Sequence, residues 1–168
     1  TRAPSVWSEA TAPLGNVANF GISGDRTQFV LWRITHGELD GCGARVVVLL
    51  IGTNNLEAAS AEGVVHGIAA NVAALRAKLP SAIIVLNALF PRGAPDDPLR
   101  AKLAEVNAKI KPLADGEHVM WVDAGAGFLD ADARLRPDLM ADGLHPTPAG
   151  YEVWASALRP VLDEALSK

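Results

Sequence analysis

The hydrophobic residues of this chain form two patterns that alternate along the sequence. Short continuous runs rich in Val, Ile and Leu occupy residues 45–51, 83–86 and 119–122, and such runs are typical of strands covered on both faces. Elsewhere apolar residues recur every three or four positions, which predicts helices. These helices are expected from a cap at Asp25 to near Gly37, and over residues 64–79, 99–113 and 151–166.

Strands that alternate with helices predict an α/β fold, a three-layer α/β/α sandwich with a mostly parallel sheet. The length of 168 residues suits one domain, spanning residues 1–168. Residues 17–20 are expected to add a short strand, and residues 1–15 to form a loop around a short turn. Thr147 and Pro148 are a cap and first-turn residue for the final helix.

The composition excludes several classes of protein. Hydrophobic residues make up 49% and charged residues 20%, with a net charge of −4, which argues against a nucleic-acid partner. The one cysteine, Cys42, excludes an internal disulfide and leaves no cysteine cluster for a metal. No apolar run approaches the roughly 18 residues that span a bilayer. We therefore expect neither a metal nor another cofactor.

Three loops carry polar chemistry where the strands are expected to end. Asp142 lies three residues before His145 in a segment rich in Gly and Pro, so a turn can place the carboxylate against the imidazole. Gly24 lies in a glycine-rich turn, and Asn54 follows a buried strand. In open parallel sheets, sites form beyond the carboxyl ends of the strands. Each loop also has an ordinary interpretation, as a solvated turn or as a turn that needs positive φ.

Four motifs together resemble the SGNH (GDSL-type) hydrolases. They are NFGISGDRTQFVLWRI, VVVLLIGTNN, LFPRGAPDDPLR and DGLHPTPAGY, in that order. The resemblance is strongest to the branch of the platelet-activating-factor acetylhydrolase catalytic subunits and bacterial acetyl esterases, and it implies a flavodoxin-like sheet.

The resemblance also implies a role for individual residues. It makes His145 the general base, oriented by Asp142, and it places the Gly24 N–H and the Asn54 side chain in the oxyanion hole. Thr53 and Leu144 match positions that line a tight acyl pocket, which favours acetyl groups.

One part of the family pattern is missing. The family's nucleophile is the serine of a Gly-Asp-Ser motif at the end of its first strand, and these 168 residues contain no such motif. We therefore expect the fold to lack that strand within this chain. We also expect a separate N-terminal fragment to supply the serine. Ser23 is the alternative within the chain.

These observations predict a serine esterase for short-chain, acetyl-like esters, with acetylated carbohydrates as one possible substrate class. A non-catalytic binding or scaffold subunit with the same fold remains an alternative, as does a lysophospholipase or thioesterase. The resemblance allows a homodimer, and a secreted or periplasmic location is compatible with the sequence. The sequence alone leaves the compartment unknown.

Overall fold

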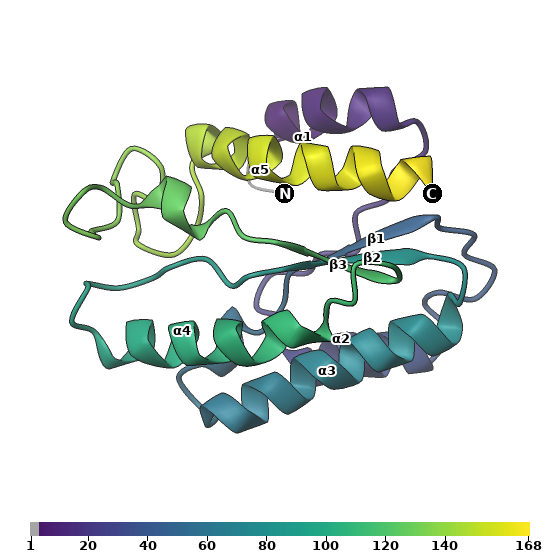
Figure 1. Ribbon diagram of the computed structural model, residues 1–168, viewed down its shortest axis with the longest axis horizontal. Helices are drawn as coiled ribbons and strands as arrows, with labels where there is room; N and C mark the ends of the chain where they lie inside the picture. The colour runs from purple at the N-terminus through teal and green to yellow at the C-terminus, as the bar shows by residue number, and fades with distance from the viewer. Residues whose placement is uncertain (1–3) are drawn as a thin grey trace.

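A computed structural model describes residues 4–168 and shows helices on both faces of a sheet (Figure 1). The elements in chain order are α1 (Pro4–Thr11), the 3₁₀ turn η1 (Ala12–Leu14), α2 (Thr27–Thr35), β1 (Val46–Leu49), η2 (Thr53–Asn55), α3 (Ala61–Lys78), β2 (Ile83–Asn87), α4 (Pro98–Ile110), η3 (Lys111–Leu113), β3 (Val119–Val122), η4 (Gly125–Phe128) and α5 (Pro148–Ser167).

The described strands form one parallel sheet in the order β1-β2-β3. Both pairs of strands are parallel, with Val47 opposite Ile84 and Ile84 opposite Val119, so all three strands run in the same direction. Because the strands are parallel, the segments that follow them leave from the same edge of the sheet. The loops containing residues 50–60, 88–97 and 123–147 therefore start at one edge, as Figure 1 shows.

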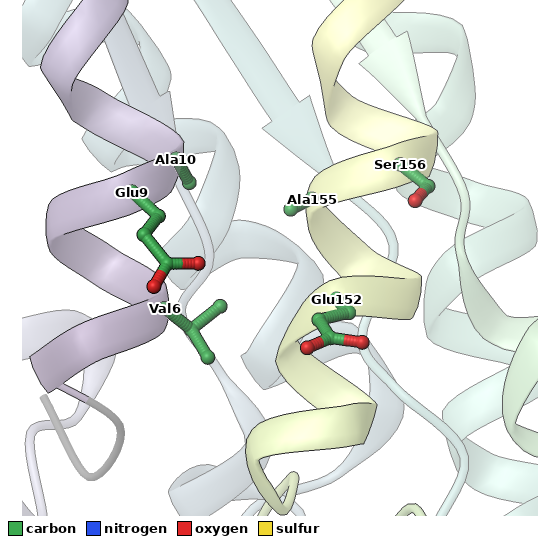
Figure 2. A pocket seen from close by; sticks show the side chains of 6 residues that line it. All are labelled: Val6, Glu9, Ala10, Glu152, Ala155 and Ser156. Atoms are coloured by element: carbon green, nitrogen blue, oxygen red, sulfur yellow. The ribbon is translucent and has the colours of Figure 1, made fainter.

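Helices α2, α3 and α4 lie on one face of the sheet, and α1 and α5 lie on the other (Figure 1). Figure 2 shows α1 beside α5, with a hollow between them lined by six side chains. Arg159 of α5 donates from Nη2 to the carbonyl of Ala10 in α1, at 2.7 Å. The predicted three-layer α/β/α fold with a parallel sheet is confirmed.

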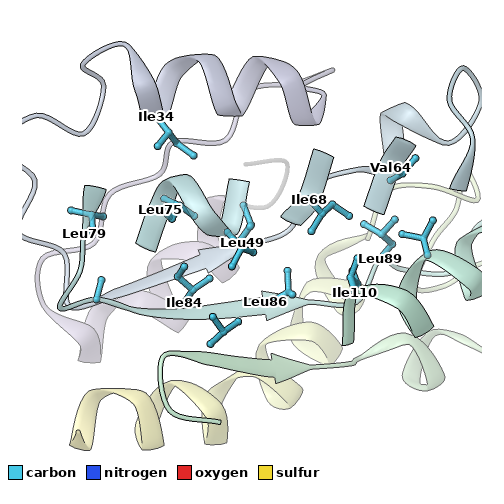
Figure 3. Close-up of a cluster of buried hydrophobic side chains, with 14 of the residues drawn as sticks. Ile34, Leu49, Val64, Ile68, Leu75, Leu79, Ile84, Leu86, Leu89 and Ile110 are labelled. Atoms are coloured by element: carbon cyan, nitrogen blue, oxygen red, sulfur yellow. The ribbon is translucent and has the colours of Figure 1, made fainter. Parts of the chain in front are cut away.

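The alternation of side chains along β2 builds the core on both faces of the sheet. Ile84 and Leu86 point toward α3 and belong to the larger cluster together with its buried Val64 and Ile68 (Figure 3). Val85 belongs to the cluster on the α5 side. Since successive strand residues face opposite sides, this continuous apolar run requires helices on both sides.

The N-terminal segment differs from the sequence expectation in two places. Residues 4–11 form helix α1 rather than a loop, because the helix gains packing and a hydrogen bond against α5. Residues 17–20 form no strand: Val17 and Phe20 are exposed, and the carbonyl of Phe20 instead accepts from Arg33 of α2 at 3.0 Å. A strand needs a neighbour for its N–H and C=O groups, and this segment has none among the described residues.

Strand β1 is less covered than its sequence predicts. Its run of Val and Leu suggested burial on both faces, yet the Val48 side chain is 39% exposed. The reason is its position, since β1 lies at an edge of the described sheet and pairs with β2 alone. In addition to Val48, Phe29 and Trp32 of α2 are exposed large apolar residues.

Candidate active site

A tight turn holds His145 against Asp142. Oδ1 of Asp142 accepts from the backbone N–H of Leu144 at 3.0 Å and of His145 at 2.7 Å. Its Oδ2 lies 2.7 Å from Nδ1 of His145. Because an ionised carboxylate only accepts hydrogen bonds, Nδ1 is the donor, and Nε2 is left as the basic nitrogen. The predicted contact between the two side chains is therefore present in the fold.

The same hydrogen bonds set the protonation of the carboxylate. The backbone N–H of His145, followed by its imidazole and the N–H of Leu144, holds the pKa of Asp142 well below its usual range. A carboxyl group with a lowered folded pKa stabilises the fold above its unfolded pKa, and this contribution is lost as the pH falls toward the folded value. Asp142 is thus negatively charged wherever a neutral His145 can act as a base.

The chain on either side of this turn is anchored. Thr147 accepts from the N–H of Gly150 at 3.2 Å and donates to the carbonyl of Asp138 at 2.7 Å, so it caps α5 as predicted. A Cβ on Gly150 would lie 2.3 Å from the carbonyl oxygen of Leu139, so only glycine allows this close approach. Gly143 has a φ of +72°, which glycine adopts without strain.

A second turn of the same kind lies before β3. Asp115 accepts from the N–H groups of Val119, Glu117 and His118 at 2.7–2.9 Å, and these bonds, that of Val119 first, hold its pKa well below the usual range. Its Oδ2 lies 3.5 Å from Nδ1 of His118. This turn is at the amino end of β3, at the opposite edge of the sheet from the loops that carry the candidate site. The local Asp-Gly-X-His geometry therefore does not by itself identify a site.

The other two candidate loops carry Asn54 and Gly24. They are far apart in sequence but lie together in the fold. Nδ2 of Asn54 donates to the carbonyl of Asp25 at 2.8 Å, which places the amide next to Gly24. Gly24 is exposed, with a φ of +80°. Asp25 does not cap α2 as predicted, because its carboxylate pairs with Arg33. The second hydrogen of the Asn54 amide remains a potential donor.

Thr53 and Leu144, the predicted acyl-pocket residues, are half-buried in these loops.

Two basic residues that the sequence did not single out hold the loop of residues 50–60. Arg92 donates to the carbonyl of Thr53 at 3.2 Å and to Glu57 at 2.8 Å, and Lys102 donates to the carbonyl of Leu56 at 2.9 Å. Their hydrogen bonds span 35 to 46 residues, so no local pattern predicts them.

Other features that could mark a functional site lie away from these loops or are absent from the described residues. The hollow in Figure 2 is lined by residues of α1 and α5 and by none of the six predicted site residues. Trp154 packs edge-on against Phe90 and donates to Oδ1 of Asn87 at 2.8 Å, so it serves packing. Within residues 4–168, no group of three His, Cys, Asp or Glu side chains has an arrangement that could hold a metal. No helix in that range is long and apolar enough to cross a membrane.

Comparisons with known proteins agree with this fold. The family model described as GDSL-like lipase/acylhydrolase matches residues 1–153. The human platelet-activating factor acetylhydrolase IB subunit alpha2 is 38% identical over 164 residues, which cover 97% of this chain and 71% of that protein.

Solved structures are similar in fold. A GDSL-like lipase from Bacteroides thetaiotaomicron superposes with a TM-score of 0.80 at 20% identity, over 95% of this chain and 81% of that one. A carbohydrate esterase family 3 structure from Talaromyces cellulolyticus superposes with a TM-score of 0.75 at 18% identity, over 98% of this chain and 90% of that one.

Proposed function

Because this chain belongs to the GDSL-like lipase/acylhydrolase family, we propose that it carries most of the active site of a serine esterase for acetyl and similarly short acyl groups. The observation that carries this proposal is the Asp142–His145 contact, which leaves Nε2 of His145 as a base at the sheet edge where the Asn54 loop also starts. The name of the human relative, an acetylhydrolase, supports the acetyl preference.

The proposed reaction is acyl transfer to a serine and then to water. Nε2 of His145 takes the proton of the serine hydroxyl as the oxygen attacks the ester carbonyl carbon. The resulting oxyanion accepts from the N–H of Gly24 and from Nδ2 of Asn54. Collapse of this intermediate expels the alcohol, which receives the proton from His145. Water then hydrolyses the acyl-serine by the same steps, giving the carboxylic acid and the original serine.

We propose that the nucleophilic serine lies on a segment outside these 168 residues. The chain has no Gly-Asp-Ser, and no hydrogen bond in the described region joins a serine hydroxyl to His145. Ser60 is engaged in capping α3, where it accepts from the N–H of Gly63 at 3.1 Å. Among the described strands β1 pairs with β2 alone, so its other edge offers a position for an added parallel strand, whose carboxyl end would reach the candidate loops.

Labelling with a fluorophosphonate, which reacts with activated serines, locates the nucleophile. We expect the label on the serine of a Gly-Asp-Ser segment and unchanged labelling in Ser23→Ala. Intact mass under denaturing conditions shows whether that segment is a separate chain, as the sequence analysis predicts, or part of the same polypeptide. Label on Ser23 would overturn the proposal that the nucleophilic serine lies outside these 168 residues. A folded chain that has the Gly-Asp-Ser segment with it, yet shows neither label nor hydrolysis, would instead support a binding subunit.

An acyl-chain series tests the acetyl preference. With aryl esters, kcat/KM is expected to be about tenfold or more higher for acetyl than for octanoyl, because an overfilled pocket costs about 1–3 kcal/mol. Leu144→Ala is expected to narrow this difference by enlarging the pocket. Leu113→Ala, which shortens a half-buried leucine of η3, is the control and is expected to leave the ratio unchanged. A preference for octanoyl would favour the lysophospholipase or thioesterase alternative.

A further inference from the structure

Asn54 and Asn55 are consecutive residues, and both bind the segment that begins α2. Nδ2 of Asn54 donates to the carbonyl of Asp25 at 2.8 Å. Oδ1 of Asn55 accepts from the backbone N–H of Thr27 at 3.0 Å. The two side chains therefore hold residues 25–27 through one carbonyl and one N–H group. Asn55 and Thr27 are buried, at 8% and 3% exposure, so water does not compete for this second bond.

Helix α2 has no side-chain cap of its own. Arg26 occupies the N-cap position without such a bond, and the carboxylate of Asp25 is paired with Arg33. The N–H of Thr27 is one of the first-turn donors that a helix leaves without an internal partner. A buried donor needs an acceptor, and Asn55 supplies one from 28 residues further along the chain. The cap of α2 thus adjoins the candidate oxyanion donor Asn54.

Helix α3 holds Thr27 from the other side. Nδ2 of Asn71, which is fully buried, donates to the carbonyl of Thr27 at 2.9 Å and to that of Gly67 at 2.7 Å. A Cβ on Gly67 would lie 2.3 Å from Oγ1 of Thr27, so the start of α2 is in direct contact with α3. With its backbone bonded on both sides, Thr27 is a fixed point three residues after Gly24.

We propose that Asn55 is a positioning residue for the oxyanion hole. By capping α2 at Thr27, it fixes the Gly24 turn relative to Asn54. The Gly24 N–H and the Asn54 amide can then both donate to the oxyanion. Asn55 itself points into the protein and does not touch the substrate. This inference rests on the proposed esterase function, because it concerns the two donors of that site.

The test compares two substitutions at one position. Asn55→Ala removes the acceptor, and kcat toward an aryl acetate is expected to fall about 10²-fold with KM little changed, as for a misplacement of about 1 Å. Asn55→Asp keeps the acceptor, and a carboxylate suits a helix N-terminus, so it is expected to restore most of the activity. Nδ2 of Asn55 donates to Oε1 of the exposed Gln28 at 3.1 Å, and Gln28→Ala is expected to lower kcat by a smaller factor.

Ser60→Ala is the matched control, since it removes the cap of α3 without touching residues 24–27. Its kcat is expected to equal that of the wild type. An Asn55→Ala protein with wild-type kcat would overturn the proposal, and so would an Asn55→Asp protein as impaired as Asn55→Ala. A loss of stability alone, with kcat intact, would also overturn it.

A second readout does not depend on activity. The NMR signals of the Gly24 N–H and the Asn54 side-chain amide are expected to shift in Asn55→Ala and to return toward wild-type positions in Asn55→Asp. Signals that stay in place would overturn the positioning role. If the wild-type chain, together with the segment that bears the serine, lacks esterase activity while these signals shift as expected, the proposed function fails and the hydrogen-bonded arrangement of the loops stands.

Discussion

Replacing His145 by alanine is expected to lower kcat toward an aryl acetate about 10⁴-fold or more, with little change in KM. The imidazole is the proposed base that takes the serine proton and returns it to the leaving alcohol, and loss of such a group removes most of a triad's rate enhancement. Asp142→Asn is expected to be nearly as damaging, because the amide no longer holds Nδ1 as the donor. Initial rates with a short aryl ester measure both effects.

His118→Ala is the control for this experiment. His118 and Asp115 form the other Asp-Gly-X-His turn, in which the carboxylate likewise accepts from the two N–H groups at positions 117 and 118, at the far edge of the sheet. The rate of the His118→Ala variant is expected to match that of the wild type. If His118→Ala lost as much activity as His145→Ala, the effect would be one of turn stability. If neither variant lost activity, His145 would not be the base.

Replacing Asn54 by alanine is expected to lower kcat about 10²–10³-fold, the usual loss when one oxyanion-hole donor is removed. Its Nδ2 has one hydrogen bonded to the carbonyl of Asp25, and the other is the proposed donor to the oxyanion. Asn54→Asp is expected to be at least as impaired, because a carboxylate cannot donate and repels the negative oxygen. KM should change little, since the interaction strengthens only as charge develops on that oxygen.

Asn107→Ala controls for loosening of a loop. Asn107 holds Leu89 after β2, with its Oδ1 accepting from the backbone N–H at 2.8 Å and its Nδ2 donating to the carbonyl at 2.9 Å. It thus anchors a loop at the same sheet edge and is not a proposed donor to the substrate. We expect a far smaller loss of kcat than for Asn54→Ala. Equal losses would mean that Asn54 matters only as an anchor.

Local patterns predicted the interior of this fold well. The strand at residues 119–122 matches β3 residue for residue, and the run at 83–86 lies within β2. These segments are buried on both faces, so their apolar composition reflects their position directly. Thr147 was identified as the cap of α5 because capping depends on residues only three apart.

The sequence interpretation failed where a segment depends on a distant partner. Residues 17–20 have strand-forming composition but no neighbouring strand, and residues 4–11 become helical against α5. Asp25 looked like the cap of α2, yet it pairs with Arg33 while Asn55 takes over the cap. Such exchanges between distant residues leave no trace in local spacing.

For the candidate site, the sequence by itself identified the candidate residues and the turn that joins Asp142 to His145. That turn closes within four residues through bonds to its own backbone, so it needs little support from the rest of the chain. Only the tertiary structure decided that Asn54 meets the Gly24 turn and that Asn55 caps α2, since these contacts join segments 27 to 29 residues apart. Their cause is the packing of α2 on α3, which brings both loops to the same edge of the sheet.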